Sequence, residues 1–193
     1  MIGDTLKLIA DQLNTFFKFR FDTEENKVVL DSVVSPDGQI VDNTDKVVVT
    51  LVNVQQEKLT RNFNSYKSHS NNSFTKAKPT VTLNLFVAIS CLFSDKNYQQ
   101  SLTFLSAVVS FFQNKYAFTH DNTPELSNQV GKLTFEMENF SPQEIGHLWG
   151  VIGSKYVPSV IYKVSVFNYF GDDIDQVIPG TSQPETDDKP IGG

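Results

Sequence analysis

The chain has 193 residues, which is enough for one domain, or one domain with a tail, and for a sizeable core. Lys and Arg total 16 and Asp and Glu 22, and the net charge of −6 disfavours binding to a nucleic-acid backbone. The single Cys91 excludes an internal disulfide and a zinc site built on several thiolates. No segment resembles a secretory signal or a membrane span, so we expect a soluble protein made in a reducing compartment, without direct membrane insertion.

The first half of the chain predicts one helix, two strands and a loop. From Asp4 to about Phe19 apolar residues recur every three or four positions, which predicts a helix with Asp4 as its N-cap. β-branched segments predict strands at 27–34 and 46–54, and the second has two apolar faces, so we expect it to be covered on both sides. Residues 57–78 are polar and aperiodic, which predicts a long loop.

The middle of the chain predicts a strand followed by a helix. Residues 79–90 alternate as a strand does, and Cys91, which ends this apolar stretch, is expected to be buried. A helix is expected from Ser94 to about Gln113, with Phe104, Val108 and Phe111 flanking its buried stripe. The stripe itself is predicted to consist of Leu102, Leu105, Val109 and Phe112.

The last structured part predicts a strand, a short helix and a final strand. Residues 132–140 alternate in polarity as a half-exposed strand does. Ser141-Pro142-Gln143-Glu144 is a capping box with proline at the first helical position, and Gly153 suits the end of that helix. Residues 158–170 predict the last strand. The order of elements predicts an α+β fold: a mixed, mostly antiparallel sheet with two longer helices and one short helix packed on it.

A change of composition divides the chain after residue 170. We expect one α+β domain over residues 1–170 and an extended acidic arm over 171–193. The arm has six acidic residues and one lysine, a net charge of −5, with proline and glycine among them. Alone, a segment of this composition would lack a fixed structure.

Patterns of catalytic or metal-binding residues are not found in the sequence. His69, His120 and His147 do not have the spacing of metal ligands, and there is no G-x-S-x-G motif for a nucleophile. We therefore expect no metal, no cofactor and no enzymatic activity. An enzyme acting on a small polar substrate is an alternative that would need convergent polar side chains in a pocket.

Several stretches in fixed order resemble the cap, or tail-terminator, family of phage-tail-like contractile injection systems. The resemblance runs from Leu51 to Phe167, about three fifths of the chain, and Asn139 to Trp149 is its densest part. Residues 58–78 and the arm after Gly171 lie outside it. The other matching stretches are Leu51–Glu57, Leu83–Phe86, Phe93–Ser94, Leu105–Gln113, Phe118–Thr119, Asn122–Leu126 and Gly153–Lys163.

The resemblance implies a structural protein. Family members form a hexameric ring that ends the inner tube and the contractile sheath and couples them at the far end of a toxin-delivery particle. The implied partners are further copies of the chain and the tube and sheath proteins. The implied location is the bacterial cytoplasm during assembly, then the particle, released or membrane-anchored. Trp149, Leu148, Tyr156 and Pro158 match the family pattern, and we interpret them as packing of the short helix on the last strand.

Two oppositely charged segments are the predicted partner contacts. The polar loop carries five basic residues and no acidic residue between Lys58 and Lys78, so it suits an acidic partner, such as the arm of a neighbouring copy. A baseplate or tube-end adaptor of the same particle and a small protein-binding module are alternative functions. The predicted contact residues are Lys58, Arg61, Lys67, Lys76, Lys78, Asp172, Asp173 and Asp175.

Overall fold

In the computed structural model the chain forms two compact units, each built from two separate stretches of sequence. The first comprises residues 1–60 and 81–169, and the second comprises residues 61–80 and 170–193. The structure describes residues 1–35, 37–39, 41–57 and 82–168, and the backbone of the strand segments 66–68, 73–76 and 177–179.

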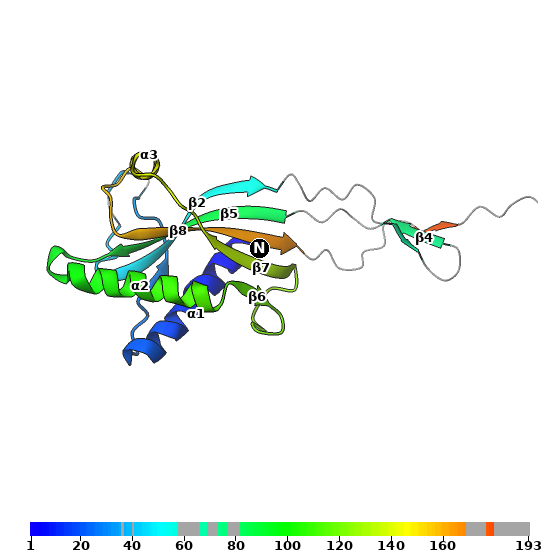
Figure 1. Ribbon diagram of the computed structural model, residues 1–193, viewed down its shortest axis with the longest axis horizontal. Coiled ribbons are helices and arrows are strands. Elements are labelled where there is room, and N and C mark those ends of the chain that lie inside the picture. Colours follow the sequence, from blue (N-terminus) through cyan, green and yellow to red (C-terminus); the bar gives the residue numbers. More distant parts are fainter. Residues whose placement is uncertain are drawn as a thin grey trace, which may run out of the picture. The chain divides into compact units, whose positions relative to one another are not determined.

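The first unit combines a six-stranded sheet with three α-helices in its described residues (Figure 1). The helices are α1 (Ile2–Phe21), α2 (Tyr98–Asn114) and α3 (Pro142–Ile152), with a 3-10 turn, η1 (Asp95–Asn97), before α2. The strands are β1 (Val28–Leu30), β2 (Lys46–Gln56), β5 (Thr82–Leu92), β6 (Ala117–Thr119), β7 (Val130–Met137) and β8 (Ser159–Asn168).

The sheet is mixed and mostly antiparallel. Its strand order is β1-β2-β5-β8-β7-β6, in which β1 and β2 are parallel and every other neighbouring pair is antiparallel. α1 and α2 lie on one face of this sheet and α3 lies on the other (Figure 1). The α+β class predicted from the order of elements is confirmed.

The main core lies between the sheet and the pair α1 and α2, and aromatic rings fill much of it. Phe17 of α1 meets Phe104 of α2 edge to face, with ring centroids 5.1 Å apart. Phe112 of α2 stacks on Phe135 of β7 at 4.6 Å. Because full burial of such a side chain stabilises a fold by about 1.5–3 kcal/mol, these rings hold both helices on the sheet.

α1 begins at Ile2, so the prediction of Asp4 as its N-cap is wrong. Met1 is the N-cap, and Asp4 is the third helical residue. The Asp4 carboxylate accepts a hydrogen bond from the Met1 backbone amine at 2.7 Å, and this bond lowers the pKa of Asp4. An acidic residue in the first turn fits either position, since both place a carboxylate near free backbone N–H groups.

The buried stripe of α2 also differs from the prediction. Leu102 is 40% exposed, and Leu105 and Val109 are half-buried. The residues expected to flank the stripe form it instead, together with Ser101, Ala107 and Phe112. α2 packs both on the sheet and on α1. Its sequence has two adjacent apolar stripes, and the helical period alone does not show which of them is buried.

Asparagine side chains bond to the outer edges of both outermost strands. At β1, the Asn14 side-chain amide donates to the Val28 carbonyl and accepts from the Val28 N–H, both at 2.8 Å. At β6, the Asn122 amide accepts from the Thr119 N–H at 3.0 Å and donates to the Ala117 carbonyl at 3.1 Å. Each amide therefore occupies backbone groups that another strand would otherwise use.

The face of the sheet under α3 carries a smaller apolar cluster. Val48, Ala88 and Ile161 are buried there, beside Trp149 of α3. Farther along this face the side chains are polar: Ser165 donates to Asn84 at 2.8 Å. The expectation that β2 is covered on both faces holds only for its first part, because most residues from Leu51 onward are exposed.

The second unit contains a three-stranded antiparallel sheet, β3-β4-β9. β3 (Tyr66–Ser68) and β4 (Ser73–Lys76) lie within the stretch predicted as a long loop, and β9 (Val177–Pro179) lies within the acidic arm. β4 therefore pairs with a strand from the far end of the same chain. Within the part of the chain that the structure describes, no helix is long and apolar enough to cross a bilayer.

Candidate partner-binding surface

Most of the residues predicted to contact partners lie outside the described residues. Lys67 lies on β3 and Lys76 on β4, where the structure describes the backbone. The pairing of β4 with β9 places strand backbone from the basic stretch beside strand backbone from the acidic arm. The predicted residues outside the described segments are Lys58, Arg61, Lys78, Asp172, Asp173 and Asp175.

The carboxylates with lowered pKa values have structural partners. The Asp45 carboxylate accepts from the Ser94 backbone N–H at 3.1 Å and from the Asn97 side chain at 3.0 Å, and these bonds lower its pKa. Hydrogen bonds from Lys27 and Lys46 lower the pKa of Glu25 to about 2. No group of three or more His, Cys, Asp or Glu in the described part of the chain is arranged to hold a metal ion.

Local sequence signals determine where α3 begins and ends. The Ser141 Oγ accepts from the Glu144 N–H at 3.3 Å, and the Glu144 carboxylate accepts from the Ser141 N–H at 2.8 Å. Pro142 begins the helix, and Gly153 ends it with a φ of 82°, a conformation that favours glycine. The predicted capping box and C-terminal glycine are thus confirmed. Such a cap stabilises a helix by about 1 kcal/mol.

The packing of α3 on the sheet is sparse for an apolar helix. Trp149 is its one fully buried residue, whereas Val151 is 84% exposed. The Trp149 ring meets Tyr156 edge-on at 6.0 Å, and Tyr156 is itself 61% exposed. The packing expected for Trp149 is therefore present, but Tyr156 contributes an exposed aromatic surface as well.

Two hollows flank α3. A groove of about 470 Å³ runs between α3 and the adjoining ends of β7 and β8, and Met137, Phe140, Ile145 and Tyr156 line part of it. A smaller hollow of about 230 Å³ separates Leu148 and its neighbours from β2 and β5. Beneath the helix, three buried polar atoms have no hydrogen-bond partner among the described residues: Ser90 Oγ, Ser159 Oγ and Trp149 Nε1.

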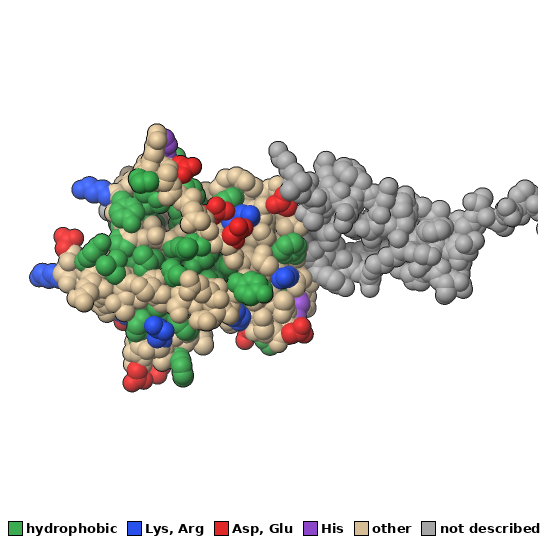
Figure 2. Space-filling view, in the orientation of Figure 1, with side chains coloured by type: hydrophobic (Ala, Val, Ile, Leu, Met, Phe, Trp, Pro, Cys, Tyr) green, Lys and Arg blue, Asp and Glu red, His purple; other side chains and the backbone are tan. Residues whose placement is uncertain are grey.

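A partly exposed apolar stripe lies on α2, on the other face of the sheet from α3. Tyr98, Leu102, Leu105 and Val109 follow one another at spacings of four, three and four residues, so they form one line along the helix. Figure 2 shows hydrophobic side chains gathered in the region between α3 and α2. Exposed apolar side chains that gather in this way are suited to a protein–protein contact. We call the groove, the α3 surface and the α2 stripe together the apolar band.

The sequence contained signals for part of this surface. The α2 stripe was identified as apolar but assigned to the core, and the short helix was identified with its caps. Phe19, which is 91% exposed near the end of α1, was not singled out. One feature of the sequence indicates that Phe19 is exposed: it lies off the apolar stripe of the helix, on the face that carries Asp11 and Thr15.

Two solved structures share this fold. The sheath/tube terminator of PVC, an extracellular contractile injection system, in its extended state, matches with a TM-score of 0.61 and 15% identity over 98% of this chain and 64% of that chain. The tube-terminating cap of the anti-feeding prophage matches with a TM-score of 0.58 and 14% identity over 92% of this chain and 60% of that chain. The chain thus spans about three fifths of the length of the structures it matches. No curated protein matches it in sequence.

The family follows from a direct sequence match. Residues 4–183 match the model of the Pvc16 N-terminal domain, so the chain belongs to that family. The resemblance to cap, or tail-terminator, proteins of contractile injection systems is confirmed by this match and by the shared fold.

Proposed function

We propose that this chain is the cap of a contractile injection system: a hexameric ring that ends the inner tube and the sheath and couples them at the far end of the particle. The observation that carries the proposal is the similarity of nearly the whole chain to a sheath/tube terminator, over 98% of its residues. Membership of the Pvc16 N-terminal domain family supports it. The role is structural and not enzymatic, in keeping with the cap and terminator proteins that the chain matches.

The physical task of a terminator fits features of the first unit. Tube and sheath grow by head-to-tail contacts, which leave an end that can always add another layer. A terminator must bind that end, and its own outer surface must not be able to bind another layer. In this chain Asn14 and Asn122 occupy the outer edges of the sheet, which opposes extension of the sheet by further strands at β1 and β6.

The partners we propose are further copies of the chain and the tube and sheath proteins. The basic stretch and the acidic arm, which contribute β4 and β9 to one sheet, are proposed to contact the tube or the sheath. Changing Lys58, Arg61 and Lys67 together to Glu is expected to weaken capping and leave the first unit folded. Unchanged capping by this triple variant would overturn the assignment.

We further propose that the protein assembles in the bacterial cytoplasm and then forms part of a toxin-delivery particle, released or membrane-anchored. The test is negative-stain imaging of particles from a strain that lacks the gene, compared with the parent strain and with a complemented strain. Absent particles, or tubes of ragged length with naked far ends, are expected. Particles of uniform length with a normal cap would contradict the proposal. Gold labelling of a tagged copy distinguishes the far end from the baseplate end, where an adaptor would lie.

A further inference from the structure

The proposed ring requires two different contact surfaces on each copy. In a ring of identical subunits, one patch of each subunit meets a different patch of the next, and the two patches lie on different sides of the molecule. The inference below rests on the proposed function, since it concerns how that ring is held together.

The first patch is the groove beside α3. Its volume of about 470 Å³ is large enough for an aromatic side chain, and its lining is mainly apolar. One acidic residue, Glu138, lines it, and Glu144 lies nearby in the first turn of α3. Ser159 also lines it, and its buried hydroxyl has no partner among the described residues. The groove is thus an apolar hollow with an acidic border.

The second patch is the end of α1, where Phe19 projects from the helix. Its side chain is 91% exposed. Phe17 and Phe21 make ring contacts inside the unit, whereas Phe19 lies on the other side of the helix from them, beside Phe16 in the preceding turn. An aromatic residue this exposed contributes no burial to its own copy, so it is suited to burial in another molecule.

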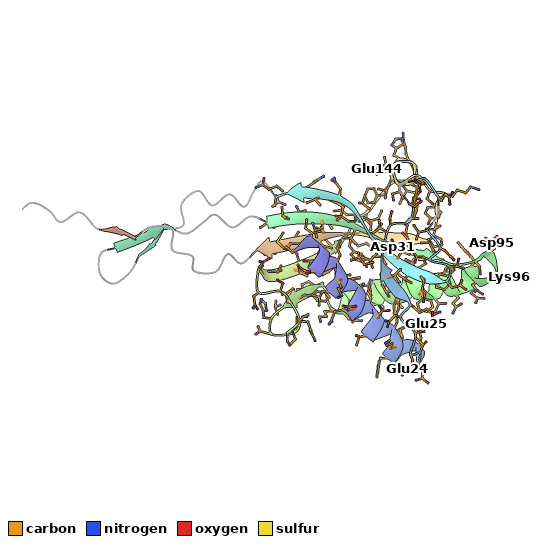
Figure 3. All side chains as sticks on the ribbon, turned by 180° about the vertical axis from the view of Figure 1, so that it is seen from behind. Glu24, Glu25, Asp31, Asp95, Lys96 and Glu144 are labelled. Carbon is orange, nitrogen blue, oxygen red and sulfur yellow. The ribbon has the colours of Figure 1, made fainter. Side chains whose placement is uncertain are left out.

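The two patches lie on opposite sides of the sheet. Figure 3 labels Glu24, just after α1, and Glu144, at the start of α3, and they mark opposite ends of the first unit. One copy therefore cannot place its own Phe19 in its own groove, but the next copy in a head-to-tail arrangement can receive it.

The charges around the two patches are complementary. Lys18 and Arg20 lie on either side of Phe19 in the last turn of α1, and Arg20 also lies over the Phe16 ring of its own helix at 5.8 Å. Glu138 lines the groove, whereas the Glu144 carboxylate is held by Ser141 in the cap of α3. Opposite charges around an apolar contact orient the partners and disfavour other pairings. We propose that Phe19 of one copy inserts into the groove beside α3 of the next copy, with Lys18 and Arg20 facing Glu138.

Cross-linking on assembled particles tests the contact directly. Cys91 is 1% exposed, so it gives little background. Thr15→Cys places a thiol one turn from Phe19 on the same exposed face, and Asn139→Cys places one at the groove, so both anchor residues stay in place. With a short bismaleimide, particles capped by the double variant are expected to give a ladder of cross-linked oligomers. Each single variant is expected to give none. A ladder from Thr15→Cys alone, or no ladder from the double variant on particles whose caps are visible, would overturn the contact.

A charge placed at the contact tests its importance. Phe19→Asp is expected to weaken ring assembly about tenfold or more, as loss of an aromatic anchor does, with unchanged circular dichroism. Thr15→Asp, one turn earlier on the same exposed face, is the matched control and is expected to assemble as the parent does. Lys18→Glu with Arg20→Glu should weaken the ring, and Glu138→Lys should restore part of the loss.

The outcomes separate this inference from the proposed function. If Phe19→Asp assembles normally and still caps tubes, the contact is wrong and the cap function stands. If Phe19→Asp forms rings but no longer caps tubes, Phe19 binds tube or sheath, and the contact between copies is again wrong. If the parent protein is absent from the far end of particles, the proposed function fails and the inference fails with it.

Discussion

Asn14 and Val28 exchange two hydrogen bonds that join α1 to the outermost strand of the sheet. The Asn14 amide donates to the Val28 carbonyl and accepts from the Val28 N–H, each at 2.8 Å, and both residues are buried. A polar residue on the buried side of a helix usually interrupts its apolar stripe. Here the Asn14 side chain satisfies the backbone groups on the outer side of β1, where no further strand pairs, so one side chain joins α1 to the edge of the sheet.

Replacement of Asn14 by Ala is expected to destabilise the first unit strongly. Both Val28 backbone groups would be buried without a partner, which costs about 2–4 kcal/mol in free energy of unfolding. Urea denaturation followed by circular dichroism measures this loss. Asn114→Ala, on the exposed end of α2, is the matched control and is expected to change stability by less than about 0.5 kcal/mol. Equal losses in the two variants would contradict the role given to Asn14.

The opposite edge of the sheet allows a graded test. Asn122→Asp replaces the donor to the Ala117 carbonyl by an oxygen that cannot donate, whereas Asn122→Ala also loses the bonds from the Thr119 N–H and the Thr123 hydroxyl. We expect both variants to be less stable than the parent, at about 1 kcal/mol for each bond removed. Thermal unfolding of the three proteins measures the losses. An alanine variant as stable as the parent would count against the edge role.

The sequence predicts the order and type of most elements of the first unit because their signals are local. A capping box at Ser141, a glycine at position 153 and alternating strands need no knowledge of their neighbours. The buried face of α2 was predicted incorrectly because it depends on tertiary partners, and the start of α1 was misplaced because an acidic residue suits the N-cap and the first turn alike. The role of Asn14 was missed because its partner Val28 lies fourteen residues away, and a side chain bonded to a distant strand leaves no periodic signal. The role of Asn122 was missed although its partners Ala117 and Thr119 are close in sequence, because the short strand that they belong to was not predicted.

The candidate surface, too, could be predicted only in part from the sequence. Residues 139–163, which include the densest part of the family resemblance, could be identified from sequence, and α3 lies there with most of its groove. The exposure of Phe19 was missed although Phe19 lies off the apolar stripe of its helix, because an aromatic residue on a helix is most often buried. The pairing of β4 with β9 joins residues about one hundred positions apart, and short strands at such separation carry too few residues to predict a partner.

The thiol of Cys91 is expected to be inert in the folded protein. Its burial raises its pKa to about 12, so at pH 8 its thiolate fraction is about a thousandfold below that of a thiol of ordinary pKa. Reaction with Ellman's reagent at pH 8 should be slow without urea and fast with it. Tyr156→Cys provides an exposed thiol as the positive control, since Tyr156 is 61% exposed. Rapid reaction of the folded parent would contradict the burial of Cys91.

The Asp45 carboxylate is expected to make stability depend on pH at the acidic end. Hydrogen bonds from the Ser94 backbone and the Asn97 side chain hold its pKa below the ordinary 3.8 in the folded state. Its contribution is therefore full above about pH 5 and is lost as the pH falls through 3.8 toward the lowered folded value. Asp45→Asn removes the charge and suits the φ of 57° at this position, because asparagine tolerates that region.

The measurement is the free energy of unfolding of the parent and of Asp45→Asn between pH 7 and pH 2. The parent should be the more stable of the two at pH 7, and the difference should shrink as the carboxylate becomes protonated. Asp37→Asn, on an exposed turn, controls for the general effect of removing one negative charge. A difference between parent and Asp45→Asn that stays constant across this range would show that the bonds from Ser94 and Asn97 do not depend on the charge, and the proposed origin of the acid sensitivity would be wrong.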